Sequence, residues 1–228
     1  MKTSELLNLF RLETDDVAKP YLWSDEEFYA YLDEAQDVHL RLVGGIADRR
    51  SALTKVTYKT GDQFKKYDDR ILRIKGAIDE SNTKIRIQNL DSLESPYLDD
   101  DYGSVFDGGL DDGRTGNLKY LITDVNNNEM QLYPIPDHDG YVRLFVYRRA
   151  LEPVTGSGSE LEVPSYSHLN LLNWVKYKAY MKQDAETFDG ARADKFKSAF
   201  TEGVLLARKE KDAREDRKRL MSYGGIPM

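Results

Sequence analysis

Apolar residues recur with helical spacing near both ends of the chain, which predicts helices in both places. The best-defined helix starts at Ser24, because Ser24 and Glu27 form the pattern of a capping box. From there apolar side chains return every three or four residues until Gly44 and Gly45 interrupt the pattern. We therefore predict a helix of roughly 20 residues that ends near Val43.

Three further helices follow from the same spacing. A short one starts near Thr3 and ends before Pro20. A second, strongly apolar helix follows Ser165, and its apolar residues surround most of the helix, which is typical of a buried helix. The last helix keeps apolar spacing over 193–207 and then becomes wholly polar over 209–219.

Between these helices the pattern changes to alternation with a period of two, which indicates β-strands. Asp124 to Asn128 separate two of the runs and are typical of a hairpin turn. The run 141–149 carries large apolar groups on both faces, so we expect it to be a central strand or one that lies between two layers. The candidate strands are 53–59, 70–76, 84–89, 118–124, 129–134 and 141–149.

These elements predict an α+β fold, in which the N- and C-terminal helices form a bundle and an antiparallel β-subdomain is inserted between them. An extended C-terminal helix or tail is expected to follow the bundle. The expected divisions are 1–46 for the N-terminal helices, 47–153 for the β-subdomain, 154–207 for the C-terminal helices and 208–228 for a projecting, partner-docking tail. Within the β-subdomain, 90–116 reads as an acidic loop.

The chain of 228 residues has 33 basic and 40 acidic side chains, a net charge of −7 and a pI of about 5.1. This balance argues against a protein that wraps nucleic acid electrostatically. The absence of cysteine excludes disulfides, thiolate chemistry and a zinc ribbon. No apolar stretch is long enough to span a membrane, so we expect a soluble protein made in the cytoplasm without membrane contact.

No catalytic, metal-binding or cofactor-binding pattern is present in the sequence. The histidines His39, His138 and His168 are far apart, and structural roles are expected for each. Phosphate-binding glycine loops and the nucleophile elbow are absent. The run that starts at Asp124 lacks the glycine of a calcium loop and has Ile135 where the bidentate glutamate belongs, which favours a plain hairpin. We therefore expect no catalytic residue, no metal and no cofactor.

Two segments are candidates for contacts with other molecules. The acidic loop could hold a cation, repel DNA or simply be solvated, and its aspartates are Asp99, Asp100, Asp101, Asp107, Asp111 and Asp112. The polar C-terminal segment is either a solvated helix end or a segment that a partner orders, since a helix without an apolar face is marginal in water. Its candidate contact residues are Arg208, Lys209, Arg214, Arg217, Lys218, Arg219, Leu220, Met221, Tyr223 and Ile226.

The order and spacing of several motifs resemble those of the head–tail adaptor (connector) proteins of tailed bacteriophages. The motifs are the Pro-Tyr-Leu-Trp-Ser-Asp-Glu-Glu entry at 20–27, Glu-Ala-Gln at 34–36, the stretch 140–149, Leu-Glu-Val-Pro at 161–164 and Tyr-Gly-Gly-Ile at 223–226. The acidic loop is longer than the usual turn of this family, which leaves its role open.

The resemblance implies a structural virion protein of the neck, without enzymatic activity, that forms a twelve-subunit ring. In such a ring the C-terminal segment reaches the portal protein and the opposite end receives a tail tube or nozzle protein. The acidic loop would face the tail or the lumen. Double-stranded DNA would pass through the lumen without specific binding.

Two other functions stay open at this point. The protein could be a tail or receptor-contact module whose β-subdomain binds a host glycan. Less favoured is a metal-dependent hydrolase that uses the acidic loop, in which Asp99 or Asp111 would be essential.

Overall fold

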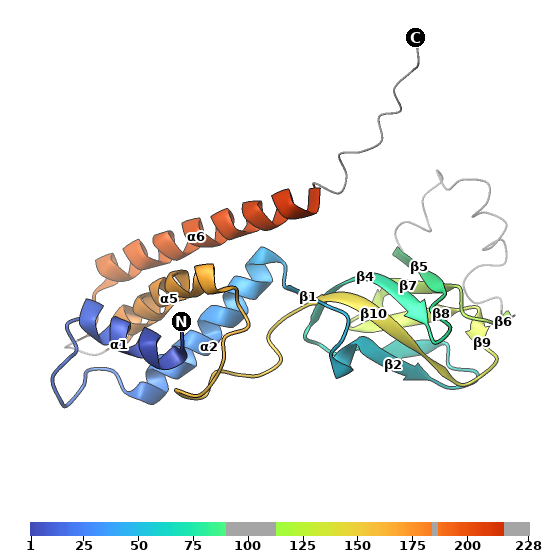
Figure 1. Ribbon diagram of the computed structural model, residues 1–228, viewed down its shortest axis with the longest axis horizontal. Helices are drawn as coiled ribbons and strands as arrows, with labels where there is room; N and C mark the ends of the chain where they lie inside the picture. The colour runs from blue at the N-terminus through green and yellow to red at the C-terminus, as the bar shows by residue number, and fades with distance from the viewer. Residues whose placement is uncertain (90–112, 184–186, 217–228) are drawn as a thin grey trace, which may run out of the picture. The chain divides into compact units, whose positions relative to one another are not determined.

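The computed structural model describes residues 1–89, 113–183 and 187–216. It confirms a mixed α+β fold with two compact units (Figure 1). The helical unit combines Met1–Gly45 with Arg149–Met228, and the sheet unit is Ile46–Arg148. The terminal parts of the chain thus form one unit, and the middle part forms the other.

The helical unit contains four α-helices among the described residues. The second one begins as the sequence predicts, because the hydroxyl of Ser24 accepts a hydrogen bond from the Glu27 amide at 3.1 Å and the Glu27 carboxylate accepts one from the Ser24 amide at 2.9 Å. Gly44, with φ +82°, ends it in the left-handed region. The helices are α1 (Thr3–Glu13), α2 (Asp25–Val43), α5 (His168–Met181), which follows the 3₁₀ turn η2 (Ser165–Ser167), and α6 (Gly190–Asp216).

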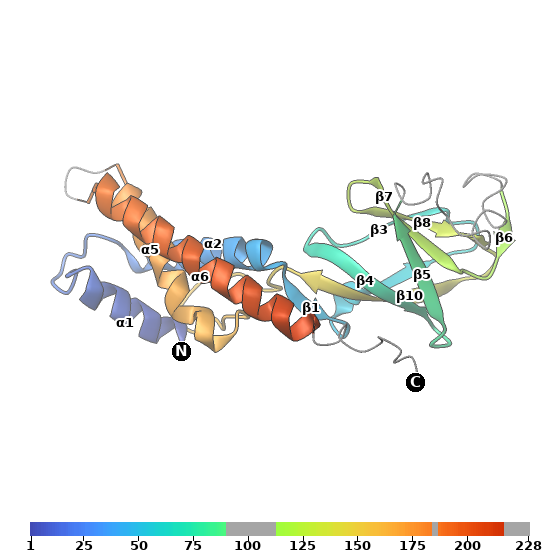
Figure 2. The same cartoon turned by 90° about the horizontal axis from the view of Figure 1, so that it is seen from above.

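Helix α5 lies at the centre of this unit and packs against α1, α2 and α6. Figure 2 shows α6 running across α5 and α2. At one end, the Phe10 ring lies 5.5 Å from Trp23 and 5.3 Å from Phe28, and the Trp23 indole donates a hydrogen bond to the carbonyl of Ala179. Aromatic residues that flank the start of α2 therefore join α1, α2 and α5.

The sheet unit is built on one long curled sheet with the order β1-β10-β4-β5-β7-β8-β3, in which β2 also pairs with β10. Strand β10 is central, as predicted, because β4 pairs with one edge while β1 and β2 pair with the other. Its strands are β1 (Ile46–Asp48), β2 (Lys55–Tyr58), β3 (Phe64–Lys66), β4 (Ile71–Asp79), β5 (Lys84–Asn89), β7 (Tyr120–Asn126), β8 (Glu129–Tyr133) and β10 (Gly140–Arg148). The short strands β6 (Thr115–Gly116) and β9 (Ile135–Pro136) form a separate pair.

The inward-facing side chains of β10 form the centre of the core of this unit. Val142, Leu144 and Val146 alternate along the strand and are buried together with residues of β4, β5, β7 and β8. The outward-facing positions of β10 carry larger polar and aromatic side chains. The two faces of this strand thus have different roles.

The sheet departs from the sequence predictions in two ways. The predicted antiparallel subdomain is confirmed for most strand pairs, whereas β5 with β7 and β6 with β9 are parallel. The long stretch between Asn89 and Tyr120 permits this, because parallel neighbours need a connection of about a dozen residues or more. The first predicted strand, 53–59, begins instead as a 3₁₀ turn at Ala52–Thr54, and 115–116 of the predicted acidic loop form β6.

Candidate interaction surfaces

Helix α6 packs one face on the helical unit and leaves the other exposed. Phe200, Val204 and Ala207 are buried, while Leu205 and Leu206 are 52% and 60% exposed. Two adjacent exposed leucines on a helix with a buried opposite face mark a candidate contact surface.

The sequence singled out ten residues near the C-terminus, of which Arg208, Lys209 and Arg214 are described. Arg208 and Lys209 are exposed one turn after the leucine pair, so basic and apolar side chains adjoin on the same side of α6. The Arg214 guanidinium lies 5.4 Å from the centre of the Tyr166 ring and 3.7 Å from the Glu210 carboxylate. The other seven, Arg217, Lys218, Arg219, Leu220, Met221, Tyr223 and Ile226, lie outside the described residues.

The polar part of α6 is fastened to its own unit through Lys211. Its ammonium donates hydrogen bonds to the carbonyls of Val43, Gly44 and Gly45 at 3.2, 2.8 and 2.9 Å. These carbonyls belong to the C-terminal end of α2, where the helix dipole favours a cation. Sequence spacing did not reveal this contact, because it joins residues more than 160 positions apart.

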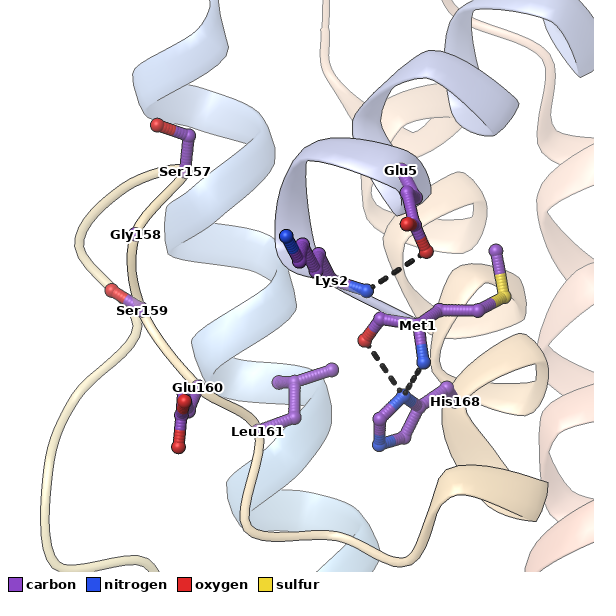
Figure 3. A pocket seen from close by; sticks show the side chains of 9 residues that line it. All are labelled: Met1, Lys2, Glu5, Ser157, Gly158, Ser159, Glu160, Leu161 and His168. Carbon is purple, nitrogen blue, oxygen red and sulfur yellow. Dashed lines mark hydrogen bonds between the residues drawn. The ribbon is translucent and has the colours of Figure 1, made fainter.

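A cleft of about 640 Å³ lies where the chain's N-terminus meets the loop 157–161 and the start of α5 (Figure 3). The Met1 amine is 3.2 Å from Nδ1 of His168, and Nε2 of the same ring is 2.8 Å from the carbonyl of Val163. Because a carbonyl can only accept, Nε2 donates to Val163, and Nδ1 lies 3.2 Å from both the amine and the carbonyl oxygen of Met1. Both nitrogens of His168 thus contact other parts of the chain, and the ring joins the N-terminus to the segment before α5.

The other two histidines lie in different units and in different surroundings. His39 is buried, its ring centre lies 6.5 Å from that of Phe200, and burial lowers its pKa to about 4. His138 is exposed, and its hydrogen bond to the Asp137 carboxylate at 2.7 Å raises its pKa. Within the described ranges, no group of three or more histidine, aspartate or glutamate side chains could hold a metal ion.

Of the acidic stretches 124–128 and 99–112, the structure describes the first but not the aspartates of the second. Asp124 and Asn128, with φ +64° and +52°, flank the turn between β7 and β8, which confirms the predicted hairpin. The aspartates of the predicted loop, Asp99, Asp100, Asp101, Asp107, Asp111 and Asp112, lie outside the described residues.

The outward-facing side of β10 carries a surface that sequence analysis missed. Its aromatic rings are those of the half-buried Tyr141 and Phe145 and of Tyr147, which is 4% exposed, and exposed or half-buried cations lie beside them. We call this set the cationic aromatic face, and it consists of Tyr141, Phe145, Tyr147, Arg49, Lys55, Arg73 and Arg143. The alternation along β10 is visible in the sequence, but three of the four cations come from outside β10, so only the strand register reveals the cluster.

Comparison with known proteins gives one match that spans nearly the whole chain. Residues 1–223 match the family model described as SU10 adaptor protein, which includes both the helical and the sheet unit. No curated protein matches the chain. None of the helices in the described part of the chain is both long and apolar enough to cross a membrane.

Proposed function

The chain belongs to the SU10 adaptor protein family, a family of phage head–tail adaptors, and from this premise we propose that it joins the portal to the tail in the virion neck. Membership in the family makes the protein a structural virion component that binds other virion components, and the family is not one of enzymes. The single observation that carries the proposal is the match over 1–223, because it includes every described element.

In the proposed assembly, twelve copies form a ring through which the genome passes. Each copy presents one surface to a different surface of its neighbour, which is the requirement for a closed ring with head-to-tail contacts. Twelve copies with a net charge of −7 each give a ring of −84. Such a charge disfavours lasting contact with DNA phosphates and suits passage without specific binding.

We assign the portal contact to the exposed side of α6 and the residues that follow it. Leu205 and Leu206 supply apolar area, and Arg208 and Lys209 supply charge beside it. Interfaces commonly combine an apolar centre with a polar rim, and this arrangement has both parts. The seven predicted contact residues between Arg217 and Ile226 extend the same segment. We place the tail tube or nozzle protein at the opposite end of the ring.

Portal binding by two variants tests this assignment. We expect Leu205→Asp combined with Leu206→Asp, and separately removal of 217–228, to weaken co-sedimentation with purified portal by about tenfold or more, since buried charges oppose an apolar contact. Leu12→Asp is the matched control, because Leu12 is an exposed leucine of α1, at 69% exposure. Undiminished binding by both variants would show that the portal contact lies elsewhere.

Electron microscopy of the protein mixed with portal tests the ring itself. We expect class averages with a twelve-fold ring stacked on the portal. A portal that carries no ring at any protein concentration would contradict the adaptor assembly, whatever the outcome for α6. The alternative of a metal-dependent hydrolase depends on Asp99 or Asp111, which lie outside the described residues.

A further inference from the structure

The cationic aromatic face is built by the register of β10 with the three strands that pair with it, β1, β2 and β4. Gly76 lies directly opposite Phe145 and Ala47 directly opposite Tyr147, so small residues leave room for the rings. A Cβ atom on Gly76 would lie 2.9 Å from Cδ2 of Phe145, closer than such contacts allow. The side chain of Phe145 therefore occupies the space beside Gly76 that a larger residue would need.

Each of these three rings has a cation of the face close to its centre. The Lys55 ammonium lies 4.1 Å from the centre of the Tyr141 ring, and the Arg49 guanidinium lies 5.1 Å from that of Phe145. The Arg73 guanidinium lies 5.6 Å from that of Tyr147. These distances fall within the range of cation–π contacts, which orient a cation without neutralising its charge.

The four cations of this face form no ion pair in the part of the chain that the structure describes. None of Arg49, Lys55, Arg73 and Arg143 forms an ion pair there, whereas elsewhere in the sheet unit Lys65 pairs with Asp62, Arg70 with Asp68 and Arg148 with Asp48. Moreover, Lys55 and Arg143 are direct cross-strand partners. Like charges in that position repel each other, so an anionic partner would stabilise the face.

The sequence contains an acidic stretch whose charge is opposite to that of the face. In the described part of the sheet unit, 46–89 and 113–148 hold 15 basic and 10 acidic residues, a balance of +5. The stretch 90–112 holds eight acidic residues and no basic one, a balance of −8. Within one chain, a cationic surface and an acidic stretch therefore complement each other in charge.

We propose that the cationic aromatic face of one copy binds the acidic stretch 90–112 of a second copy. The inference rests on the proposed ring, in which each copy needs two different surfaces that fit each other. It gives the acidic stretch a role between subunits in place of the tail-facing or lumen-facing role that the sequence suggested. DNA is the weaker candidate, because a net charge of −7 and a stretch of −8 in the same unit oppose phosphates.

Charge reversal tests the contact directly. One variant reverses the charge of the face from +4 to −4 by replacing its four cations, Arg49, Lys55, Arg73 and Arg143, with glutamate. The other reverses the charge of the stretch from −8 to +4 by replacing six aspartates with lysine, namely Asp99, Asp100, Asp101, Asp107, Asp111 and Asp112. We expect each variant alone to form rings on the portal about tenfold less well than the wild type, since like charges then meet. An equimolar mixture restores ring formation, because an alternating ring brings opposite charges together at every contact.

The matched control for the first variant replaces Lys59, Lys66, Lys84 and Lys119 with glutamate, which makes the same change of charge at four exposed lysines of the sheet unit. We expect this control to assemble like the wild type. Circular dichroism is used to check that each variant is folded. If both reversed variants assemble normally while the wild type forms rings, the inference is wrong and the adaptor proposal stands. If the wild type forms no ring, both fail.

Two further outcomes would also overturn the inference. Rescue in a chain that carries both reversals, without rescue in the mixture, would place the contact within one copy. A loss of binding to a fluorescent DNA duplex with unchanged ring formation would make the face a DNA contact.

Cross-linking of wild-type rings gives an independent readout that needs no variant. A carbodiimide joins an ammonium directly to a carboxylate, so it can couple Lys55 to the acidic stretch. In rings that mix ¹⁴N and ¹⁵N protein, we expect linked peptides that contain both isotopes. Linked peptides of a single isotope only, or none that join Lys55 to 90–112, would contradict the contact between copies.

Discussion

At the scale of single residues, Arg11 holds the turn between the first two helices together. Its buried guanidinium pairs with the Asp16 and Asp25 carboxylates, both at 2.5 Å, and donates to the carbonyl of Trp23 at 3.0 Å. Asp16 is itself buried and accepts from the amide of Leu22. A charged network therefore fixes the chain where it leaves α1 and enters α2.

Removal of the Arg11 charge should be costly. We expect Arg11→Met to lower the free energy of unfolding by about 3 kcal/mol, because Asp16 then stays buried without its partner. Urea denaturation followed by circular dichroism measures the change. Arg41→Met is the control, since Arg41 is exposed and pairs loosely with Asp37 at 3.9 Å, and its effect should stay within about 0.5 kcal/mol. An equally small effect at Arg11 would show that the network adds no stability.

His39 should make stability depend on pH. Burial lowers its pKa to about 4 from an ordinary 6.5, so the unfolded chain binds the proton more readily. The stability that the neutral ring allows is complete above pH 6.5 and is lost as pH falls toward 4, by about 2 kcal/mol between pH 7 and pH 5. Unfolding of His39→Leu over this range should lack that slope, and His138→Gln should keep it. A wild-type stability that does not change with pH would refute the prediction.

At the scale of elements, local signals in the sequence predicted long elements well. The capping box at Ser24 and the left-handed Gly44 placed both ends of α2, since each depends on residues close in sequence. The strands β1, β3, β6 and β9 have only two or three residues and exist through pairing with distant strands, so no periodicity could reveal them.

The interaction surfaces were only partly predictable for a related reason. Leu205 and Leu206 fall outside the apolar stripe of α6, and this deviation was readable from the sequence. The cationic aromatic face was not, because three of its four cations lie outside β10 and are brought beside it by a strand register that the sequence does not state. A helix surface is encoded by nearby residues, whereas a sheet surface requires knowledge of which strands are neighbours.

The contact of Lys211 with α2 leads to a prediction at this scale. We expect Lys211→Met to lower the free energy of unfolding by about 1–2 kcal/mol, because three carbonyls at the end of α2 lose a charged donor. Lys209→Met, two residues earlier and exposed, should change it by about 0.5 kcal/mol or less. Urea unfolding at low and high salt measures both. Equal effects of the two substitutions would contradict a specific role of Lys211.

At the scale of the whole molecule, the sheet unit is inserted into the helical unit through two connections. The chain enters the sheet unit at Ile46 and leaves it at Arg148, and these two residues are direct partners across β1 and β10. In the helical unit, α1 and α2 precede the insertion in the sequence, and they pack against α5 and α6, which follow it. Each unit therefore has a core of its own.

This organisation predicts that the helical unit folds without the sheet. We expect a chain in which a short glycine–serine linker replaces 46–148 to keep its helical circular dichroism and to unfold cooperatively. Such a chain should still bind portal through α6 but should not form rings, if the sheet supplies the contacts between copies. Loss of helical structure in this chain would show that the helices depend on the sheet.

The pairing of Ile46 with Arg148 also bears on how this architecture can evolve. Because the insert begins and ends at neighbouring positions, it behaves like a cassette that can be exchanged at one graft point without rethreading the helices. Phages that keep the same bundle could thus adapt their necks to new tails by exchanging this cassette. Differences in length among such adaptors should accumulate between Gly45 and Arg149, and the bundle should stay constant in size.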